Sequence, residues 1–234
     1  MPFSLKERIK LFLLLESDSI ELSYIDAKKF EEELDEEDID NLRKFKYRSI
    51  HAPVFITPDG IYENRKVLFY PAENTKEILN QIIEVADKIQ ADTILFHPDN
   101  ITDFAALEKI FGERLAFENL DSRKEKFNQV KDLRQAYLLA PKAKFVLDVN
   151  HIYTMDKTMS LARDFYDNFK DRLCHYHLSA FGGFHDCFIS TGEDIILKGL
   201  IDLEIPIIHE GNALKNGLIS LKAEHQYILN HLNN

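Results

Sequence analysis

The sequence predicts an α/β protein of the (β/α)8-type barrel class. Segments with a strand pattern alternate regularly with helical segments along the 234 residues. The strand segments are almost continuously apolar, as parallel strands are when helices cover their sheet. The alternative, an open doubly wound sheet, is disfavoured because no Gly-x-Gly-x-x-Gly follows a first strand. The length fits one barrel as well as two small domains, and we expect a single domain over residues 1–234.

Seven segments have the composition of strands: residues 20–24, 47–53, 93–98, 115–119, 144–149, 173–179 and 205–210. Helices are expected around them: residues 4–16, Asp26 to about Phe45, 74–89, Thr102 to Gly112, Val130–Leu139, Asp156 to about Lys170, Glu193–Ile201, and from about Leu214 onward. Because the chain begins in a helix, the first barrel strand is either missing or disguised in the first few residues.

The composition bounds the class of protein. Hydrophobic residues make up 45% and charged residues 29%, the balance of a soluble globular protein. The net charge of −11 counts mildly against a nucleic-acid substrate, although a local groove can be basic. Cys174 and Cys187 match neither a zinc knuckle nor a redox pair, so we expect free thiols in a reducing, cytoplasmic setting. No apolar run approaches a membrane span, and we expect no membrane partner.

Chemically active residue types stand where the predicted strands end, which is where barrel enzymes carry their chemistry. In chain order they are His51, His97, Glu118, Asp148 with His151, His177, and Glu210. Glu118 and Asp148 carry the most weight, since carboxylates after apolar runs are seldom buried without a partner. His51 or His97 taken singly could equally be a hydrogen-bonded structural histidine. The joint pattern is far less expected by chance than any one member.

Glu, Asp and His ligands without Cys suit a divalent cation, with Zn²⁺ or Mn²⁺ favoured by the imidazoles and Mg²⁺ as an alternative. His175 shares a strand face with His177 but lies deeper, so we expect a structural role for it. His209 alternates with Glu210 and should therefore face the helices if Glu210 faces the barrel.

At these strand ends the chain resembles the xylose isomerase-like TIM-barrel superfamily, which includes sugar phosphate isomerases and epimerases and the AP endonuclease family with endonuclease IV. The segments that carry the resemblance are 49–53, 96–98, 117–119, 147–151, 177–179 and 209–210. For an isomerase or epimerase, the resemblance implies one divalent ion held by Glu118, Asp148, His177 and Glu210. The two glutamates would also transfer protons.

For an enzyme like endonuclease IV, the resemblance implies three zinc ions. The matching positions are His51, His97, Glu118, Asp148, His151, His177, His185 and Glu210. Two departures stand out. Gly183 occupies the place of the acid in an Asp-x-His pair of endonuclease IV, and the arginine that epimerases usually carry is absent between Arg172 and Gly192.

Three functions follow as hypotheses. The first is a metal-dependent isomerase or epimerase of a small sugar or sugar phosphate, working through an enediolate with Glu118 and Glu210 as base and acid and His151 orienting the substrate. The second is a zinc phosphodiesterase of the endonuclease IV kind acting on abasic DNA; the many histidines favour it, and the acidic charge and the lost acid oppose it. The third is a non-catalytic metal- or sugar-binding barrel. An exposed sheet edge left by a missing first strand would favour a homodimer.

Overall fold

The structure, a computed structural model, describes residues 3–31, 34–183, 185–212 and 218–232. The helices are α1 (Leu5–Leu14), α2 (Glu36–Leu42), α3 (Lys76–Ile89), α4 (Phe104–Phe111), α5 (Val130–Leu139), α6 (Val149–Met155), α7 (Ser160–Phe169), α8 (Phe188–Thr191) and α9 (Leu218–Leu232). The strands are β1 (Ser19–Ser23), β2 (Tyr47–His51), β3 (Phe55–Ile56), β4 (Lys66–Val67), β5 (Thr93–Phe96), β6 (Leu115–Glu118), β7 (Lys144–Asp148), β8 (Leu173–Leu178) and β9 (Ile207–His209). No helix of the described residues is long and apolar enough to cross a membrane.

The main sheet has seven strands in the order β1-β2-β5-β6-β7-β8-β9, which is their order along the chain. The pairings β1–β2, β2–β5, β5–β6 and β8–β9 are parallel. All seven strands predicted from the sequence are present. The fold class is therefore α/β of the TIM-barrel type, and within residues 3–18 the chain forms α1 rather than an eighth strand.

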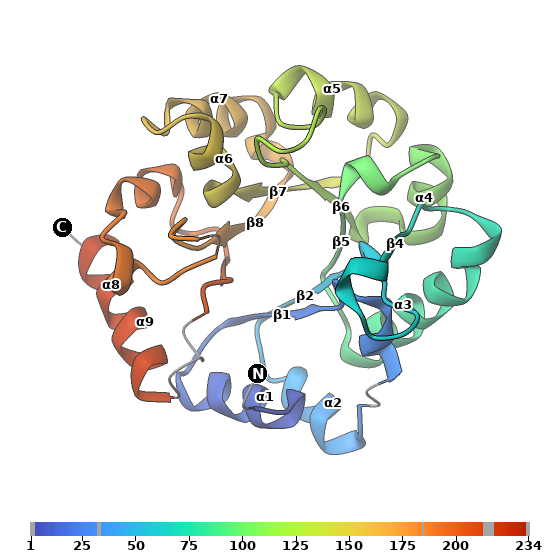
Figure 1. Ribbon diagram of the computed structural model, residues 1–234, viewed down its shortest axis with the longest axis horizontal. Helices are drawn as coiled ribbons and strands as arrows, with labels where there is room; N and C mark the ends of the chain where they lie inside the picture. The colour runs from blue at the N-terminus through green and yellow to red at the C-terminus, as the bar shows by residue number, and fades with distance from the viewer. Residues whose placement is uncertain (1–2, 32–33, 184, 213–217, 233–234) are drawn as a thin grey trace. The chain divides into compact units, whose positions relative to one another are not determined.

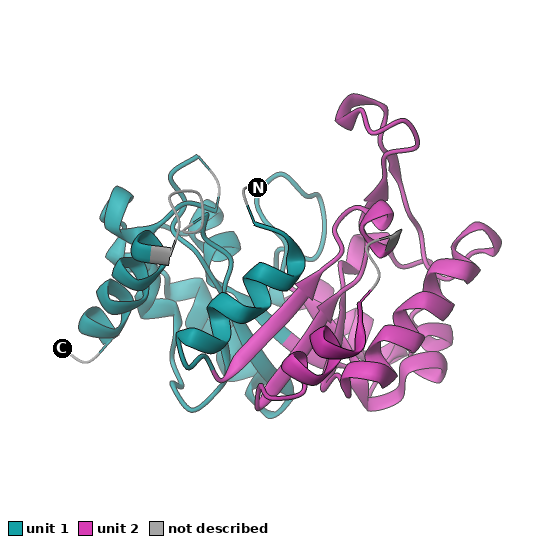
Figure 2. Cartoon of the chain, turned by 90° about the horizontal axis from the view of Figure 1, so that it is seen from below, with its two compact units in different colours: residues 1–17, 119–130, 146–234 teal, residues 18–118, 131–145 magenta. Residues whose placement is uncertain are grey.

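The chain divides into two compact units (Figure 2). Unit 2 comprises residues 18–118 and 131–145, and unit 1 comprises residues 1–17, 119–130 and 146–234. In unit 2, β1, β2, β5 and β6 form a parallel sheet, and Figure 1 shows α3 and α4 to one side of these strands. Helix α3 buries Leu79, Ile82, Ala86 and Ile89 at helical spacing, and burial of this stripe fixes the helix on the sheet.

Unit 1 contains β8 and β9 with α1 and α6 to α9. Asp148 ends β7 and is also the N-cap of α6, where its carboxylate accepts the His151 N–H at 2.8 Å. This corrects the expectation that β7 leads into a loop and that the next helix starts at Asp156. A carboxylate at an N-cap satisfies an otherwise unpaired helix N–H, so the helix can begin at once.

Two other helix predictions were wrong in extent. The acidic segment from Asp26 to Phe45 forms a short 3-10 helix, Ala27–Glu31, and then α2, which starts at an Asp35–Asp38 capping box. The helix expected at Glu193–Ile201 is a 3-10 helix, Asp194–Gly199. The expected start of the last helix, Leu214, lies outside the described residues.

Candidate metal centre

Three predicted site residues of unit 2 converge at the ends of neighbouring strands. His97 Nε2 lies 2.7 Å from Glu118 Oε1, and His51 Nε2 lies 3.5 Å from the same oxygen. The two Nε2 atoms are 3.2 Å apart. Parallel strands β2, β5 and β6 are adjacent, so the residues at their C-terminal ends meet at one edge of the sheet. We call these three residues the His-His-Glu cluster.

The tautomer of His51 follows from its hydrogen bond to the backbone. His51 Nδ1 lies 2.9 Å from the Ala52 carbonyl oxygen, which can only accept, so Nδ1 carries the proton. In the neutral ring Nε2 then has a lone pair, and this lone pair faces the cluster. A backbone carbonyl behind the ring is the usual way in which proteins orient a histidine ligand.

The donor set of the His-His-Glu cluster fits a divalent cation. Without an ion, the proton on His97 Nε2 can bind Glu118 Oε1; the His51 and Glu118 side chains are buried, and that of His97 is 16% exposed. With one, all three atoms share a partner of the kind they prefer, because zinc takes imidazole nitrogen and carboxylate oxygen. The three ligand atoms lie within 4.8 Å of one another, as they must to share an ion.

In unit 1, Asp148 and His151 form a second group. Besides its N-cap bond, Asp148 places Oδ2 3.3 Å from His151 Nδ1. The same Nδ1 lies 2.8 Å from the Asn119 carbonyl oxygen, to which it donates, so Nε2 of the neutral ring is again a ligand-type atom. Asn119 also makes two hydrogen bonds with the backbone of Asp148.

Asp121 is a member of this group that the sequence reasoning missed. Its Oδ2 lies 3.9 Å from His151 Nε2, and its carboxylate accepts two side-chain hydrogen bonds from Arg123. Burial raises the pKa of Asp121, but the hydrogen bonds from the Arg123 side chain and backbone and the charges of His151 and Arg123 outweigh it, and the pKa falls to about 2. The position of Asp121, three residues after the end of β6, was the signal in the sequence that could have identified it.

Glu210 lies between two histidines of unit 1. Its Oε1 is 3.5 Å from His177 Nδ1 and its Oε2 is 3.6 Å from His185 Nδ1. The same His185 nitrogen lies 3.0 Å from Ser179 Oγ. The rings of His185 and His151 are 6.3 Å apart, so this group adjoins the Asp148 group.

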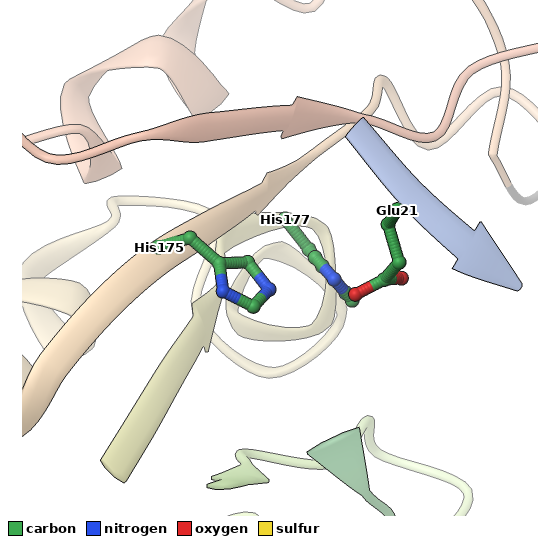
Figure 3. Close-up of side chains that lie close together, drawn as sticks. All are labelled: Glu21, His175 and His177. Atoms are coloured by element: carbon green, nitrogen blue, oxygen red, sulfur yellow. The ribbon is translucent and has the colours of Figure 1, made fainter. Parts of the chain in front are cut away.

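Two further histidines, His175 and His209, lie on the strand faces expected for them, and the structural role of His175 stays a prediction. His175 is fully buried one pleat below His177, and Figure 3 shows both imidazoles on the same side of β8. His209 Nε2 lies 3.4 Å from Glu224 Oε1 on α9, which confirms that His209 faces the helices. Glu224 is buried and also accepts the N–H groups of Phe188 and Ile189 at the start of α8.

The structure thus brings together His51, His97 and Glu118 in unit 2. In unit 1 it brings Asp148 to His151, and His177 to Glu210 and His185. A shared ion for Glu118, Asp148, His177 and Glu210 stays a prediction, because Glu118 belongs to unit 2 and the other three to unit 1.

Comparison with known proteins identifies relatives by structure only. No protein-family model matches the sequence, and no curated protein matches it. Among solved structures, endonuclease IV from Thermus thermophilus matches with a TM-score of 0.69 at 14% identity, covering 99% of this chain and 96% of that one. A D-tagatose 3-epimerase-like protein matches with a TM-score of 0.67 at 15% identity, covering 98% and 95%.

A D-psicose 3-epimerase, solved in the presence of D-fructose, matches with a TM-score of 0.62 at 13% identity, covering 97% of this chain and 92% of that one. At such identities the likeness shows the fold alone. The chain therefore has the fold of the xylose isomerase-like TIM barrels, in agreement with the resemblance seen at its strand ends.

Proposed function

We propose that this chain is a divalent-metal-dependent hydrolase of phosphodiesters, with one zinc ion held by His51, His97 and Glu118 and further ions held in unit 1. The observation that carries the proposal is the His-His-Glu cluster. A single-ion isomerase assigns Glu118 but leaves His51 and His97 without a role, whereas their Nε2 atoms meet at the Glu118 carboxylate.

The other predicted ligands support more than one ion in the same way. Asp148 has His151 against it, and Glu210 has His185. One zinc ion needs about four ligands, and the eight ligand-type residues at these strand ends exceed that number. Endonuclease IV, a structural neighbour of this chain, makes DNA with abasic sites the phosphodiester substrate to test first.

The chain's own residues would prepare the site. Zinc ions, when bound, supply Lewis acidity towards a phosphoryl oxygen and bring the pKa of a water they bind to about 7. Ala52 and Asn119, through their carbonyl oxygens, orient the His51 and His151 rings so that in the neutral form Nε2 is the nitrogen with the lone pair. Glu118 in unit 2, and Asp148 and Glu210 in unit 1, provide negative charge that offsets the charge of the cations each unit would hold. Asp121 accepts two hydrogen bonds from the Arg123 guanidinium and offsets its positive charge, with Oδ2 3.9 Å from His151 Nε2.

The second candidate is a metal-dependent isomerase or epimerase of a small sugar or sugar phosphate. The net charge of −11 and Gly183, at the place of a zinc-binding acid, favour it over a nuclease. Glu118 and Glu210 would then transfer the proton, with His151 orienting the substrate and a single Mn²⁺, Zn²⁺ or Mg²⁺ stabilising the enediolate.

Metal content separates the candidates. We expect the purified chain to hold two or three zinc ions and to cleave a duplex with one abasic site. His51→Ala should lose one equivalent of zinc, whereas His231→Ala, which removes a half-exposed histidine of α9, should keep them all. One exchangeable Mn²⁺ or Mg²⁺ together with turnover of a ketohexose would replace the first proposal by the second. No bound metal and no effect of added metal on the melting temperature would overturn both.

A further inference from the structure

The segments that follow His51 and His97 are joined in unit 2. After β2 the chain leaves the sheet as an arm, residues 53–70, in which β3 and β4 pair antiparallel; the arm projects from unit 2 in Figure 2. After β5 the chain makes a short turn, residues 97–102, around a 3-10 helix. His51 is thus the last residue of its strand, and His97 is the first residue after its strand.

Asn100 joins the turn to both stems of the arm. Its side-chain Nδ2 donates to the Val54 carbonyl at 3.1 Å and to the Leu68 carbonyl at 2.5 Å. Its backbone N–H donates to the His97 carbonyl at 3.0 Å, and its carbonyl accepts the Tyr70 N–H at 2.8 Å. Asn100 is 2% exposed, so these bonds form out of water, where losing a partner is costly.

Other hydrogen bonds complete the same junction. Tyr70 Oη donates to the Pro53 carbonyl at 3.0 Å, and Leu68 N–H donates to the Val54 carbonyl at 3.0 Å. Thr102 Oγ1 donates to the Tyr70 carbonyl at 3.0 Å. The chain leaving His51 is therefore tied, within three residues, to the chain leaving His97.

We infer that Asn100 is the positioning residue that sets the distance between the His51 and His97 imidazoles. The sheet fixes His51, which pairs with Leu95, but β5 ends at Phe96, so the ladder stops before His97. What holds the His97 backbone is the turn closed by Asn100. Metal ligands must be held to within about 0.5 Å, which a turn meets only when its own contacts are fixed. The inference rests on the proposed metal function of this cluster.

Zinc affinity of the full chain tests the inference. Asn100→Ala removes both side-chain donors, and Asn100→Ser leaves a hydroxyl that can make one such bond. We expect Asn100→Ala to weaken zinc binding about tenfold, measured in competition with a chelator, because loss of a hydrogen bond that supports a ligand has an effect of this size in other metal sites. Asn100→Ser should weaken zinc binding less. The visible spectrum of the Co²⁺-loaded chain should change. Without metal, the Leu68 and Tyr70 amides should exchange faster.

Tyr137→Phe is the matched control. It removes another hydrogen bond from a side chain to the backbone in unit 2, from Tyr137 Oη to the Lys144 carbonyl. We expect it to lower stability while leaving zinc affinity and the Co²⁺ spectrum unchanged. Wild-type zinc affinity in Asn100→Ala, or an equal loss in Tyr137→Phe, would overturn the positioning role. If His51→Ala binds zinc as tightly as the wild type, the proposed function fails as well.

Discussion

Asn119 and Asp148 exchange two hydrogen bonds. Asn119 Nδ2 donates to the Asp148 carbonyl and Asn119 Oδ1 accepts the Asp148 N–H, both at 2.9 Å. The Asn119 side chain thus makes with the Asp148 backbone the two hydrogen bonds that a neighbouring strand would make, at the point where β7 ends. Its own carbonyl accepts from His151 Nδ1, so this one fully buried residue orients a ligand-type carboxylate and a ligand-type imidazole.

Asn119→Leu should therefore lower the free energy of unfolding by about 2 kcal/mol or more, because it leaves the Asp148 N–H and C=O buried without these partners. Urea unfolding of the metal-free chain measures the loss. Asn168→Ala, which removes an exposed hydrogen bond within α7, should cost less than about 0.5 kcal/mol. Equal effects of the two substitutions would contradict the role given to Asn119.

Glu118→Gln should abolish turnover and leave the fold intact. The amide keeps the size of the carboxylate but loses the charge that offsets the cation, and an amide oxygen is a poor zinc ligand. Zinc content, activity and circular dichroism, measured together, check the prediction. Glu84→Gln, which alters an exposed ion pair with Lys88 on α3, is the control and should be active. Retained activity in Glu118→Gln would remove Glu118 from the site.

The pKa of Asp121, lowered from 3.8 to about 2, predicts a pH-dependent contribution to stability. Because the folded-state pKa is below the unfolded one, the contribution is complete above about pH 4 and is lost as the pH falls through about 2. The shift corresponds to at most about 2 kcal/mol. Unfolding of wild type and Asp121→Asn should differ by up to this amount at pH 6 and converge near pH 2. Arg123→Ala should raise the Asp121 pKa in an NMR titration.

Glu224 should stabilise the junction of β9, α8 and α9. Burial raises its pKa, but the hydrogen bond with His209, the N–H groups of Ile189 and Phe188 and the charge of His209 together lower it below 4.5. The stabilisation is thus present above about pH 4.5 and is lost as the pH falls through the lowered value. Glu224→Ala should cost about 1–3 kcal/mol in urea unfolding at pH 7, because two helix N–H groups lose their acceptor. The exposed Glu204→Gln should have no effect.

Strand positions could be read from the sequence because buried parallel strands are nearly continuous apolar runs, and Leu115–Glu118 and Lys144–Asp148 carry charged residues only at their ends. Helix starts were harder to place. Asp148 reads as a strand end leading to a loop, yet its carboxylate caps a helix that begins at the next residue. A single side chain decides such a boundary, and periodicity does not detect it.

By itself, the sequence determined the fold class and the residue types at the strand ends. Both follow from the order of apolar and polar residues along each segment, which is a local property of the chain. Only the tertiary structure showed that the Nε2 atoms of His51 and His97, 46 residues apart, meet at Glu118. It alone revealed Asn100, Asn119 and Asp121 beside the predicted ligands. Those contacts join segments distant in sequence, and a distance between such segments is set by packing and hydrogen bonds that no local pattern encodes.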